Sequence, residues 1–275
     1  MKKKIGIIGC GHIGAAILTG FLSAKTISPE EIIVSNPDIE DLKKKFPKVL
    51  FTTQNKEATE AEICILAVRP NIVQEVLRET RPTFLSKILL ISTAACVTMD
   101  LLQSYLGKSI KIIRIMPNLG VAYGQGIIGF LANKKVTKKD KIYFRNVFSK
   151  LGLLVECNDD ETIDKLSMIS GSGPGYAAYY MENLAKQAQI YGFSRDVSRK
   201  MVLQTFAGTI RRLQKENLSF SELLTGVSTK GGITEEVIKT WDEKKLPQIL
   251  SQGISRGYAK IKRITNSYFF ASPKK

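Results

Sequence analysis

The chain has 275 residues, which is enough for two domains of ordinary size, and its 44% of hydrophobic residues excludes a disordered protein. Its four cysteines are scattered and His12 is its single histidine, so we expect neither a disulfide scaffold nor a metal site. The net charge of +16 lies in short lysine runs without interleaved aromatic residues, which favours solvated faces that attract anionic ligands over nucleic-acid binding.

The first 155 residues alternate between short β-branched runs, which predict strands, and stretches with apolar residues at helical spacing. Apolar strands separated by helices are typical of a parallel sheet covered on both faces, so we expect an α/β fold. The expected strands are 4–8, 31–35, 63–68, 88–92, 110–114, 126–131 and 153–157. The expected helices are 13–24, 39–46, 72–79, 99–106 and 138–151.

After about residue 160 the strand patterns stop, which places the expected domain boundary between residues 159 and 160. We expect an α/β domain over 1–159 and an all-helical domain over 160–275. Its first helix starts at Pro174 with Ser172 or Gly173 as the cap. The further expected helices are 195–215, 219–225, 233–244 and 247–264. No apolar run approaches the roughly 18 residues of a membrane span, so we expect a cytoplasmic protein without membrane contact.

A glycine pattern, Gly9-x-Gly11-x-x-Gly14, follows the first expected strand directly and opens the first expected helix. In this context the pattern predicts a dinucleotide site. The first glycine permits a tight turn, the second lets the backbone approach a pyrophosphate, and the third lets the helix pack on the strand. The helix N-terminus offers N–H groups to the anion. His12 lies inside the turn, which favours a side chain near phosphate over a catalytic base.

The end of the second expected strand bears on the choice of cofactor. NAD-specific folds place an acidic residue about 20 residues past the glycines, where it accepts the ribose 2′-hydroxyl. Ser35 and Asn36 occupy this position, and both can donate a hydrogen bond to a 2′-phosphate. Lys43–Lys45 lie nearby, whereas Asp38 weakens the argument but falls beyond Pro37. We therefore expect NADPH, with NADH left open.

A second glycine-rich stretch, Ser228–Glu235, leads into the helix expected at 233–244. Gly231 and Gly232 let the chain bend sharply and expose successive N–H groups, which predicts an anion-binding concavity at the start of a helix. The hydroxyl groups that flank it belong to Ser228, Thr229 and Thr234. This chemistry suits a small carboxylate, and a plain helix–helix turn is the alternative.

Taken together and in this order, these segments resemble the pyrroline-5-carboxylate reductase family over nearly the whole chain. The most specific motifs are Ser170-Gly171-Ser172-Gly173-Pro174, then Gln204-Thr205-x-x-Gly208, then Ser228-x-x-Gly231-Gly232-x-Thr234. The supporting motifs are Asn55-Lys56-Glu57, Ala67-Val68-Arg69-Pro70, Ser92-Thr93-Ala94-Ala95 and Arg114-x-Met116-Pro117-Asn118.

The resemblance implies an N-terminal Rossmann-like dinucleotide-binding domain and an all-α C-terminal dimerisation domain like that of 6-phosphogluconate dehydrogenase. It implies a homodimer, with a higher oligomer of dimers left open. The reaction would be reduction of 1-pyrroline-5-carboxylate to L-proline by NADPH or NADH, the last step of proline biosynthesis.

The resemblance also implies the site residues, among which Thr234 is the catalytic one because its hydroxyl would bond the imine nitrogen. The other substrate contacts would be Ser228, Thr229, Gly231, Gly232 and Asn118. The cofactor contacts would be Gly9, Gly11, His12, Ile13, Gly14, Ser35, Asn36, Asn55, Ala67, Val68, Arg69, Pro70 and Ala95.

The chain departs from the family pattern at several positions. Asn118-Leu119-Gly120 stands where Asn-Thr-Pro is usual, Cys96 stands where Gly is usual, and Ile233 replaces a small residue. None of these changes removes a proposed reacting group, but Leu119 and Ile233 alter the shape of the expected pocket. Two alternatives stay open. One is a reductase of another cyclic imine or of a hydroxy acid, and the other is a non-catalytic, cofactor-binding regulatory paralogue.

Overall fold

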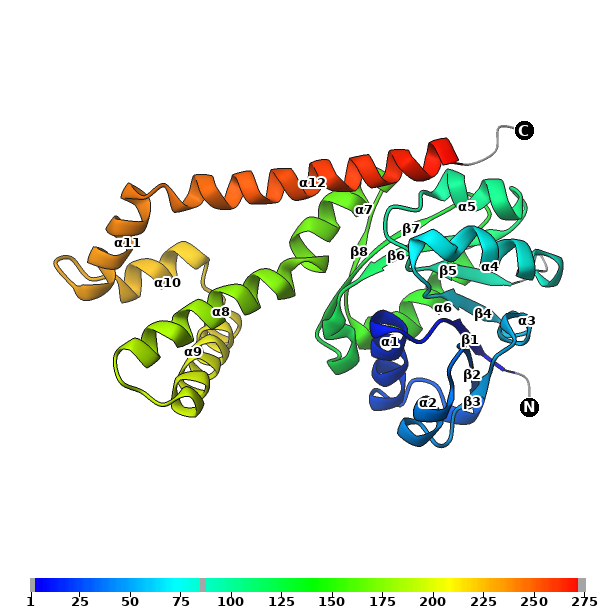
Figure 1. Ribbon diagram of the computed structural model, residues 1–275, viewed down its shortest axis with the longest axis horizontal. Helices are drawn as coiled ribbons and strands as arrows, with labels where there is room; N and C mark the ends of the chain where they lie inside the picture. Colours follow the sequence, from blue (N-terminus) through cyan, green and yellow to red (C-terminus); the bar gives the residue numbers. More distant parts are fainter. Residues whose placement is uncertain (1–2, 85–87, 272–275) are drawn as a thin grey trace. The chain divides into compact units, whose positions relative to one another are not determined.

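The computed structural model describes residues 3–84 and 88–271, the last three of them by backbone only. It divides into two compact units (Figure 1). Unit 1 comprises Met1–Ser172 and Tyr258–Lys275, and unit 2 comprises Gly173–Gly257. The sequence placed the domain boundary between residues 159 and 160, whereas unit 2 begins at Gly173. The assignment of cofactor binding to 1–159 and of dimerisation and substrate binding to 160–275 stays a prediction.

Unit 1 is built on an eight-stranded sheet in the order β3-β2-β1-β4-β5-β6-β7-β8 (Figure 1). The strands are β1 Ile5–Ile8, β2 Ile32–Ser35, β3 Leu50–Thr52, β4 Ile63–Leu66, β5 Leu89–Ser92, β6 Lys111–Pro117, β7 Gly126–Ala132 and β8 Gly152–Glu156. The first six strands run parallel, as expected for five of them, whereas β3 was not expected. β7 is antiparallel to β6, and β8 is parallel to β7. β7 reverses because only the 3-10 turn Leu119–Tyr123 connects it to β6, whereas a parallel crossover needs about a dozen residues or more.

The core of unit 1 lies on both faces of this sheet, because alternate strand residues point to opposite sides. Ile5 and Ile7 belong to one buried cluster, while Ile8 belongs to the other. The first cluster includes residues of α1 (His12–Ser23) and α6 (Lys138–Phe148), with α2 (Glu40–Lys45) packed against it. The second includes residues of α3 (Asn55–Ala58), α4 (Val73–Thr80) and α5 (Met99–Leu106). Short 3-10 turns lie at Pro29–Glu31, Pro70–Ile72, Arg81–Thr83 and Ser149–Leu151.

The chain leaves the sheet through α7 (Asp160–Leu166) and a π-helical turn, Ser167–Gly171. α8 (Gly173–Ile190) follows at once, so the expected cap at Ser172 or Gly173 is wrong. Ser172 has helical dihedral angles (φ −85°, ψ −19°) and donates its N–H to the Ser167 carbonyl. The helical run therefore has no free end at this point for a side chain to cap.

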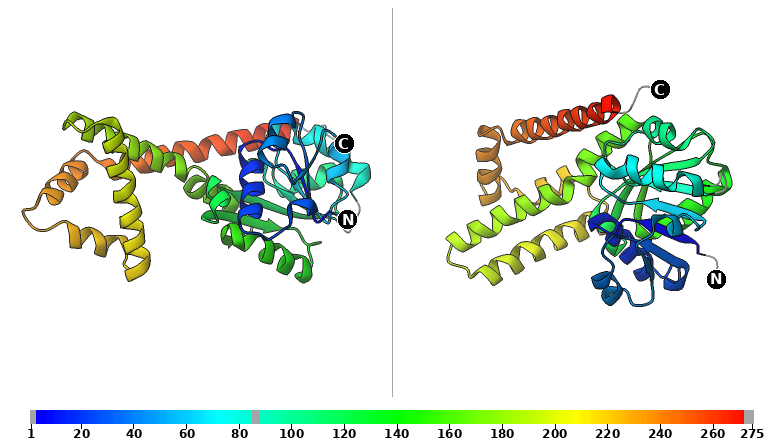
Figure 2. Two further views of the ribbon diagram at one scale, coloured as in Figure 1. Left: turned by 90° about the horizontal axis from the view of Figure 1, so that it is seen from below. Right: turned by 45° about the vertical axis from the view of Figure 1, so that its right-hand side comes forward.

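Unit 2 contains the helices α8, α9 (Arg195–Glu216), α10 (Phe220–Val227), α11 (Ile233–Glu243) and the first part of α12 (Leu246–Ala271). α8 and α9 pack side by side as an antiparallel pair (Figure 2). Within residues 173–257 only Ser198 and Val202 are buried. Large apolar side chains such as those of Phe220 and Ile233 are more than four-fifths exposed.

Candidate active site

The glycine turn lies directly after β1, and each glycine meets different surroundings. Gly9 has a φ of +93°, a conformation that glycine adopts without strain, and its N–H donates to the Ser35 carbonyl over 2.8 Å. A Cβ atom on Gly14 would lie 2.2 Å from the Gly9 carbonyl oxygen. A Cβ atom on Gly11 would have nothing within 4 Å. Gly14 therefore serves close packing, and Gly11 faces open space where a ligand can approach the backbone.

The N-terminus of α1 has backbone N–H groups that no side chain of the described residues caps. Gly11 is its N-cap and supplies no side-chain acceptor, and Ala15 donates the first bond of the helix back to Gly11. By contrast, α5, α6, α7, α9 and α10 are all capped by a serine, threonine or aspartate side chain. Uncapped N–H groups at a helix start attract anions, in keeping with the pyrophosphate predicted there.

A cavity of about 670 Å³ opens beside this turn, which is large enough for a substantial part of a cofactor. Seven of the predicted cofactor residues besides Gly11 line it, namely His12, Ile13, Ala67, Val68, Arg69, Pro70 and Ala95. Its other lining residues are Cys10, Ala15, Leu42, Lys45 and Thr93, of which the sequence had placed only Lys45, in the lysine run at 43–45, near the cofactor. Burial raises the pKa of the Cys10 thiol to about 11, so this thiol stays protonated at neutral pH.

The side chains at the end of β2 are fixed by hydrogen bonds within unit 1. The Ser35 hydroxyl donates to Asn55 Oδ1 over 2.7 Å, and Asn55 Nδ2 donates to Glu79 Oε2 over 2.8 Å. Asn36 accepts the Cys10 N–H on its Oδ1 atom over 3.0 Å. The structure thus brings predicted residues of β2 and α3 together and adds an exposed carboxylate, that of Glu79, which sequence reasoning missed.

The second predicted site lies in unit 2, between α10 and α11. Gly231 has a φ of +73°, and Gly232 is the N-cap of α11. The expectation that both glycines expose their N–H groups is wrong, because each is bonded within the chain. The Gly232 N–H donates to the Thr229 carbonyl over 2.8 Å, and the Gly231 N–H donates to Glu235 Oε2 over 2.6 Å.

The hydroxyl groups of this second loop are available to a ligand. Within the described part of the chain, those of Ser228, Thr229 and Thr234 make no hydrogen bond. Thr234 also lines an apolar groove of about 730 Å³ in unit 2, together with Tyr180 and Trp241.

Asn118 lies in unit 1, at the end of β6, and its side chain is already engaged there. Its Oδ1 atom accepts the N–H groups of Gly120 and Ile127, each over 3.2 Å, and its Nδ2 atom donates to the Ser170 carbonyl over 3.0 Å. These bonds hold the turn between β6 and β7, and a contact between Asn118 and substrate stays a prediction.

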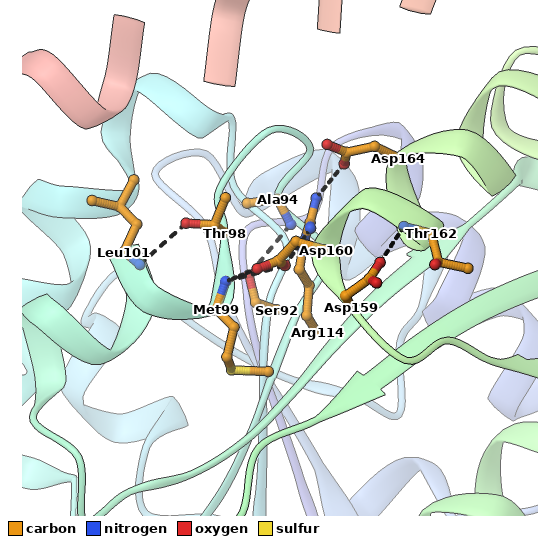
Figure 3. Close-up of polar contacts among 10 residues, drawn as sticks. All are labelled: Ser92, Ala94, Thr98, Met99, Leu101, Arg114, Asp159, Asp160, Thr162 and Asp164. Atoms are coloured by element: carbon orange, nitrogen blue, oxygen red, sulfur yellow. Dashed lines mark hydrogen bonds and ion pairs between the residues drawn. The ribbon is translucent and has the colours of Figure 1, made fainter. Parts of the chain in front are cut away.

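A buried arginine of β6 fixes α7 to the sheet (Figure 3). Arg114 of β6 is fully buried and bonds Asp160 over 2.5 Å and Asp164 over 2.8 Å. Asp160 also accepts the N–H of Met99, the first residue of α5. The supporting motif at Arg114 therefore has a structural role, because its bonds tie β6 to α7 and, through Asp160, to α5.

The parallel sheet, the glycine turn after β1 and the open donors of α1 define a dinucleotide-binding protein of the Rossmann class. A family model described as pyrroline-5-carboxylate reductase dimerisation matches residues 160–264, and one described as NADP oxidoreductase, coenzyme F420-dependent, matches residues 4–96. The pyrroline-5-carboxylate reductase of Escherichia coli is 30% identical over 270 residues, covering 97% of this chain and all of the relative. The chain belongs to the pyrroline-5-carboxylate reductase family, which confirms the predicted resemblance.

Two further relatives agree with this assignment. Pyrroline-5-carboxylate reductase 2 of Bacillus subtilis is 28% identical over 254 residues, covering 90% of each chain. The crystal structure of a Plasmodium falciparum pyrroline carboxylate reductase with NADP bound matches with a TM-score of 0.88 and 27% identity. It covers 96% of this chain and 99% of that one, which confirms the predicted fold class. Among the described residues, no helix is long and apolar enough to cross a membrane.

Proposed function

We propose that the protein reduces 1-pyrroline-5-carboxylate to L-proline, the last step of proline biosynthesis, with NADPH as the reductant. The observation that carries this proposal is the pair of glycine-rich helix starts, at α1 and at α11, within a member of this family. One is suited to a pyrophosphate, and the other has three hydroxyl groups that bond to none of the described residues and can take a small carboxylate substrate.

The residues of unit 1 fit a dinucleotide. The N–H groups at the start of α1 would hold the pyrophosphate, and the open space at Gly11 lets it approach the backbone. The 67–70 loop and Ala95 would line the nicotinamide end of the cavity. A bound dihydronicotinamide supplies a hydride to the carbon of the substrate's C=N bond.

The loop of unit 2 would bind and orient the substrate. The Ser228 and Thr229 hydroxyl groups would hold its carboxylate, joined by the Gly231 N–H once its bond to Glu235 opens. The Thr234 hydroxyl would donate to the imine nitrogen as that atom gains electron density. Thr234 can also relay a proton from water, so the reaction needs no strong general base. Orienting two reactants in this way lowers the activation barrier by several kcal/mol. In the best cases the reduction is about 7–11 kcal/mol.

The preference for NADPH is supported by the side chains at the end of β2. Ser35 and Asn36 carry no negative charge, and Lys45 lines the cofactor cavity. Glu79 opposes this preference. Its carboxylate accepts a hydrogen bond from Asn55 and would therefore lie beside the expected 2′-phosphate, which it would repel. We therefore expect Glu79→Gln to raise the ratio of NADPH to NADH affinity about threefold or more. Glu75→Gln, on the same helix without a contact to Asn55, is the matched control for calorimetry with both cofactors.

A homodimer is supported by the surface of unit 2. Its apolar side chains lie exposed at many positions, and the groove beside Trp241 and Val237 is lined mainly by apolar atoms. Exposed apolar area on this scale marks a protein interface, and the family model that matches this region describes dimerisation. Whether dimers assemble further is a question for light scattering.

The decisive experiment follows NADPH oxidation by the purified protein with 1-pyrroline-5-carboxylate and other cyclic imines, and NADP+ reduction with hydroxy acids. We expect turnover with the first substrate, and a loss of about 10²-fold or more in kcat/KM for Thr234→Ala. Thr234→Ser keeps the hydroxyl and is expected to retain most of the rate. Cofactor binding without any turnover would favour a regulatory paralogue, and turnover with a hydroxy acid alone would replace the proposed substrate.

A further inference from the structure

The start of α11 differs from the other helix starts of the chain in how its acidic residue is used. Glu235 is the third residue of this helix, and its Oε2 atom lies 2.6 Å from the backbone nitrogen of Gly231. The Gly231 N–H therefore donates to a carboxylate that belongs to the chain itself. The bond is charge-assisted, which makes it stronger than one between neutral groups.

This contact is not an ordinary capping box. In the boxes at Thr137 and Ser219, the acid three residues on accepts the N–H of the cap residue, and the hydroxyl of the cap accepts in return. Gly232, the cap of α11, has no hydroxyl to offer and donates its N–H to Thr229 instead. Glu235 reaches one residue further, to the glycine at positive φ that the carboxylate of a substrate would use.

The two glycine-capped helix starts, those of α1 and α11, thus differ in whether an acidic side chain of the chain already accepts their N–H groups. Within the described residues, no acidic side chain accepts a hydrogen bond from the start of α1. The start of α11 carries the same functional group that its proposed substrate would bring. Glu235 is exposed, so its carboxylate can exchange this N–H for water at little free-energy cost.

We propose that Glu235 is an internal competitor of the substrate's carboxylate and a specificity-determining residue of the loop. It holds the Gly231 N–H until a carboxylate that also engages the neighbouring hydroxyl groups displaces it. A ligand without a carboxylate gains nothing from this N–H and does not displace Glu235. The inference rests on the proposed function, because it takes Ser228–Thr234 as the substrate loop.

The test compares the steady-state kinetics of the full-length enzyme with those of Glu235→Ala and Glu236→Ala. Glu236 is the control, because it lies in the same helical turn, has the same charge and makes no side-chain hydrogen bond or ion pair with the described residues of the loop. We expect Glu235→Ala to lower the KM for 1-pyrroline-5-carboxylate about three- to tenfold, with kcat and the KM for NADPH unchanged. Glu236→Ala is expected to stay within about twofold of the wild type.

An unchanged or raised KM in Glu235→Ala, with normal NADPH binding, would overturn the proposal and assign Glu235 to the ordering of the loop. Equal effects of the two variants would also overturn it, since the cause would then be net charge.

A second measurement does not need turnover, because acetate can be titrated while the amide resonance of Gly231 is followed. Tighter acetate binding in Glu235→Ala supports the competitor, and equal binding overturns it. Lack of turnover in the wild type would refute the proposed function alone.

Discussion

The two units of this chain bury their apolar residues in different ways. Unit 1 has a buried cluster on each face of its sheet, and even its buried Arg114 finds two carboxylates within the chain. Unit 2 is just as helical as its sequence predicts, yet within residues 173–257 only Ser198 and Val202 are buried. A helical pattern of apolar residues therefore predicts the helix, but it does not reveal whether the apolar face packs within the chain or against a partner.

If unit 1 is complete in itself, breaking one of its internal contacts should have the largest effect on stability. Arg114→Ala leaves Asp164 buried without its cation, so we expect the free energy of unfolding to fall by about 3–5 kcal/mol. Lys44→Ala removes one partner of an exposed ion pair and should cost less than about 1 kcal/mol. Urea denaturation of both variants checks this, and similar midpoints would contradict a self-contained unit 1.

If unit 2 depends on a second copy, its unfolding must depend on protein concentration. Trp241 is the single tryptophan and lies in unit 2, so its fluorescence follows this unit alone. A hundredfold dilution should lower the apparent stability by about 2.7 kcal/mol, which lowers the melting temperature. An unchanged melting temperature across this range would show that unit 2 is stable without a partner.

A smaller effect, on dimerisation, is expected when a negative charge is added to the surface of one unit or the other. Val237 lines the groove of unit 2 and Ile142 lies on α6 of unit 1, and both side chains are 40% or more exposed. We expect Val237→Asp to weaken dimerisation by about 1–3 kcal/mol, because a carboxylate would be buried in the interface. Ile142→Asp should leave the dimer intact in analytical ultracentrifugation. Equal behaviour of the two variants would place the interface elsewhere.

The smallest effect concerns strain inside unit 1. Cys96 has a φ of +62° and is buried, which places a side chain in a backbone conformation that glycine adopts more readily. Cys96→Gly relieves this strain whereas Cys96→Ala keeps it. The glycine variant should therefore be more stable than the alanine variant by about 1 kcal/mol in thermal unfolding. The opposite order would mean that the left-handed conformation is unstrained.

The sequence predicted those parts of the fold that rest on local pattern. β1 and β4 are buried on both faces, so they are continuous apolar runs. α7 was missed because two of its inward-facing residues are Asp160 and Asp164, which a hydrophobic pattern assigns to solvent. β3 was missed because it has only three residues at the edge of the sheet.

The same limit applies to the sites. The glycine turn was predictable because a strand, three glycines and a helix follow one another in the sequence. The bond from Asn55 to Glu79 joins residues that only the tertiary fold brings together. The bond from Gly231 to Glu235 is local, but two glycines in sequence do not reveal which acceptor takes their N–H groups.

Asn36 links the preference for a cofactor to the shape of the glycine turn, because its Oδ1 atom accepts the Cys10 N–H. A substitution at this position during evolution or redesign therefore changes both properties at once. Asn36→Asp keeps an oxygen for Cys10 and adds the charge that NAD-specific folds use. Asn36→Arg adds a partner for phosphate but removes the acceptor from the turn. Asn36 Nδ2 also donates to the Asp38 carbonyl over 2.6 Å, and both substitutions disturb this bond, so a change of cofactor at this position also changes the loop after β2.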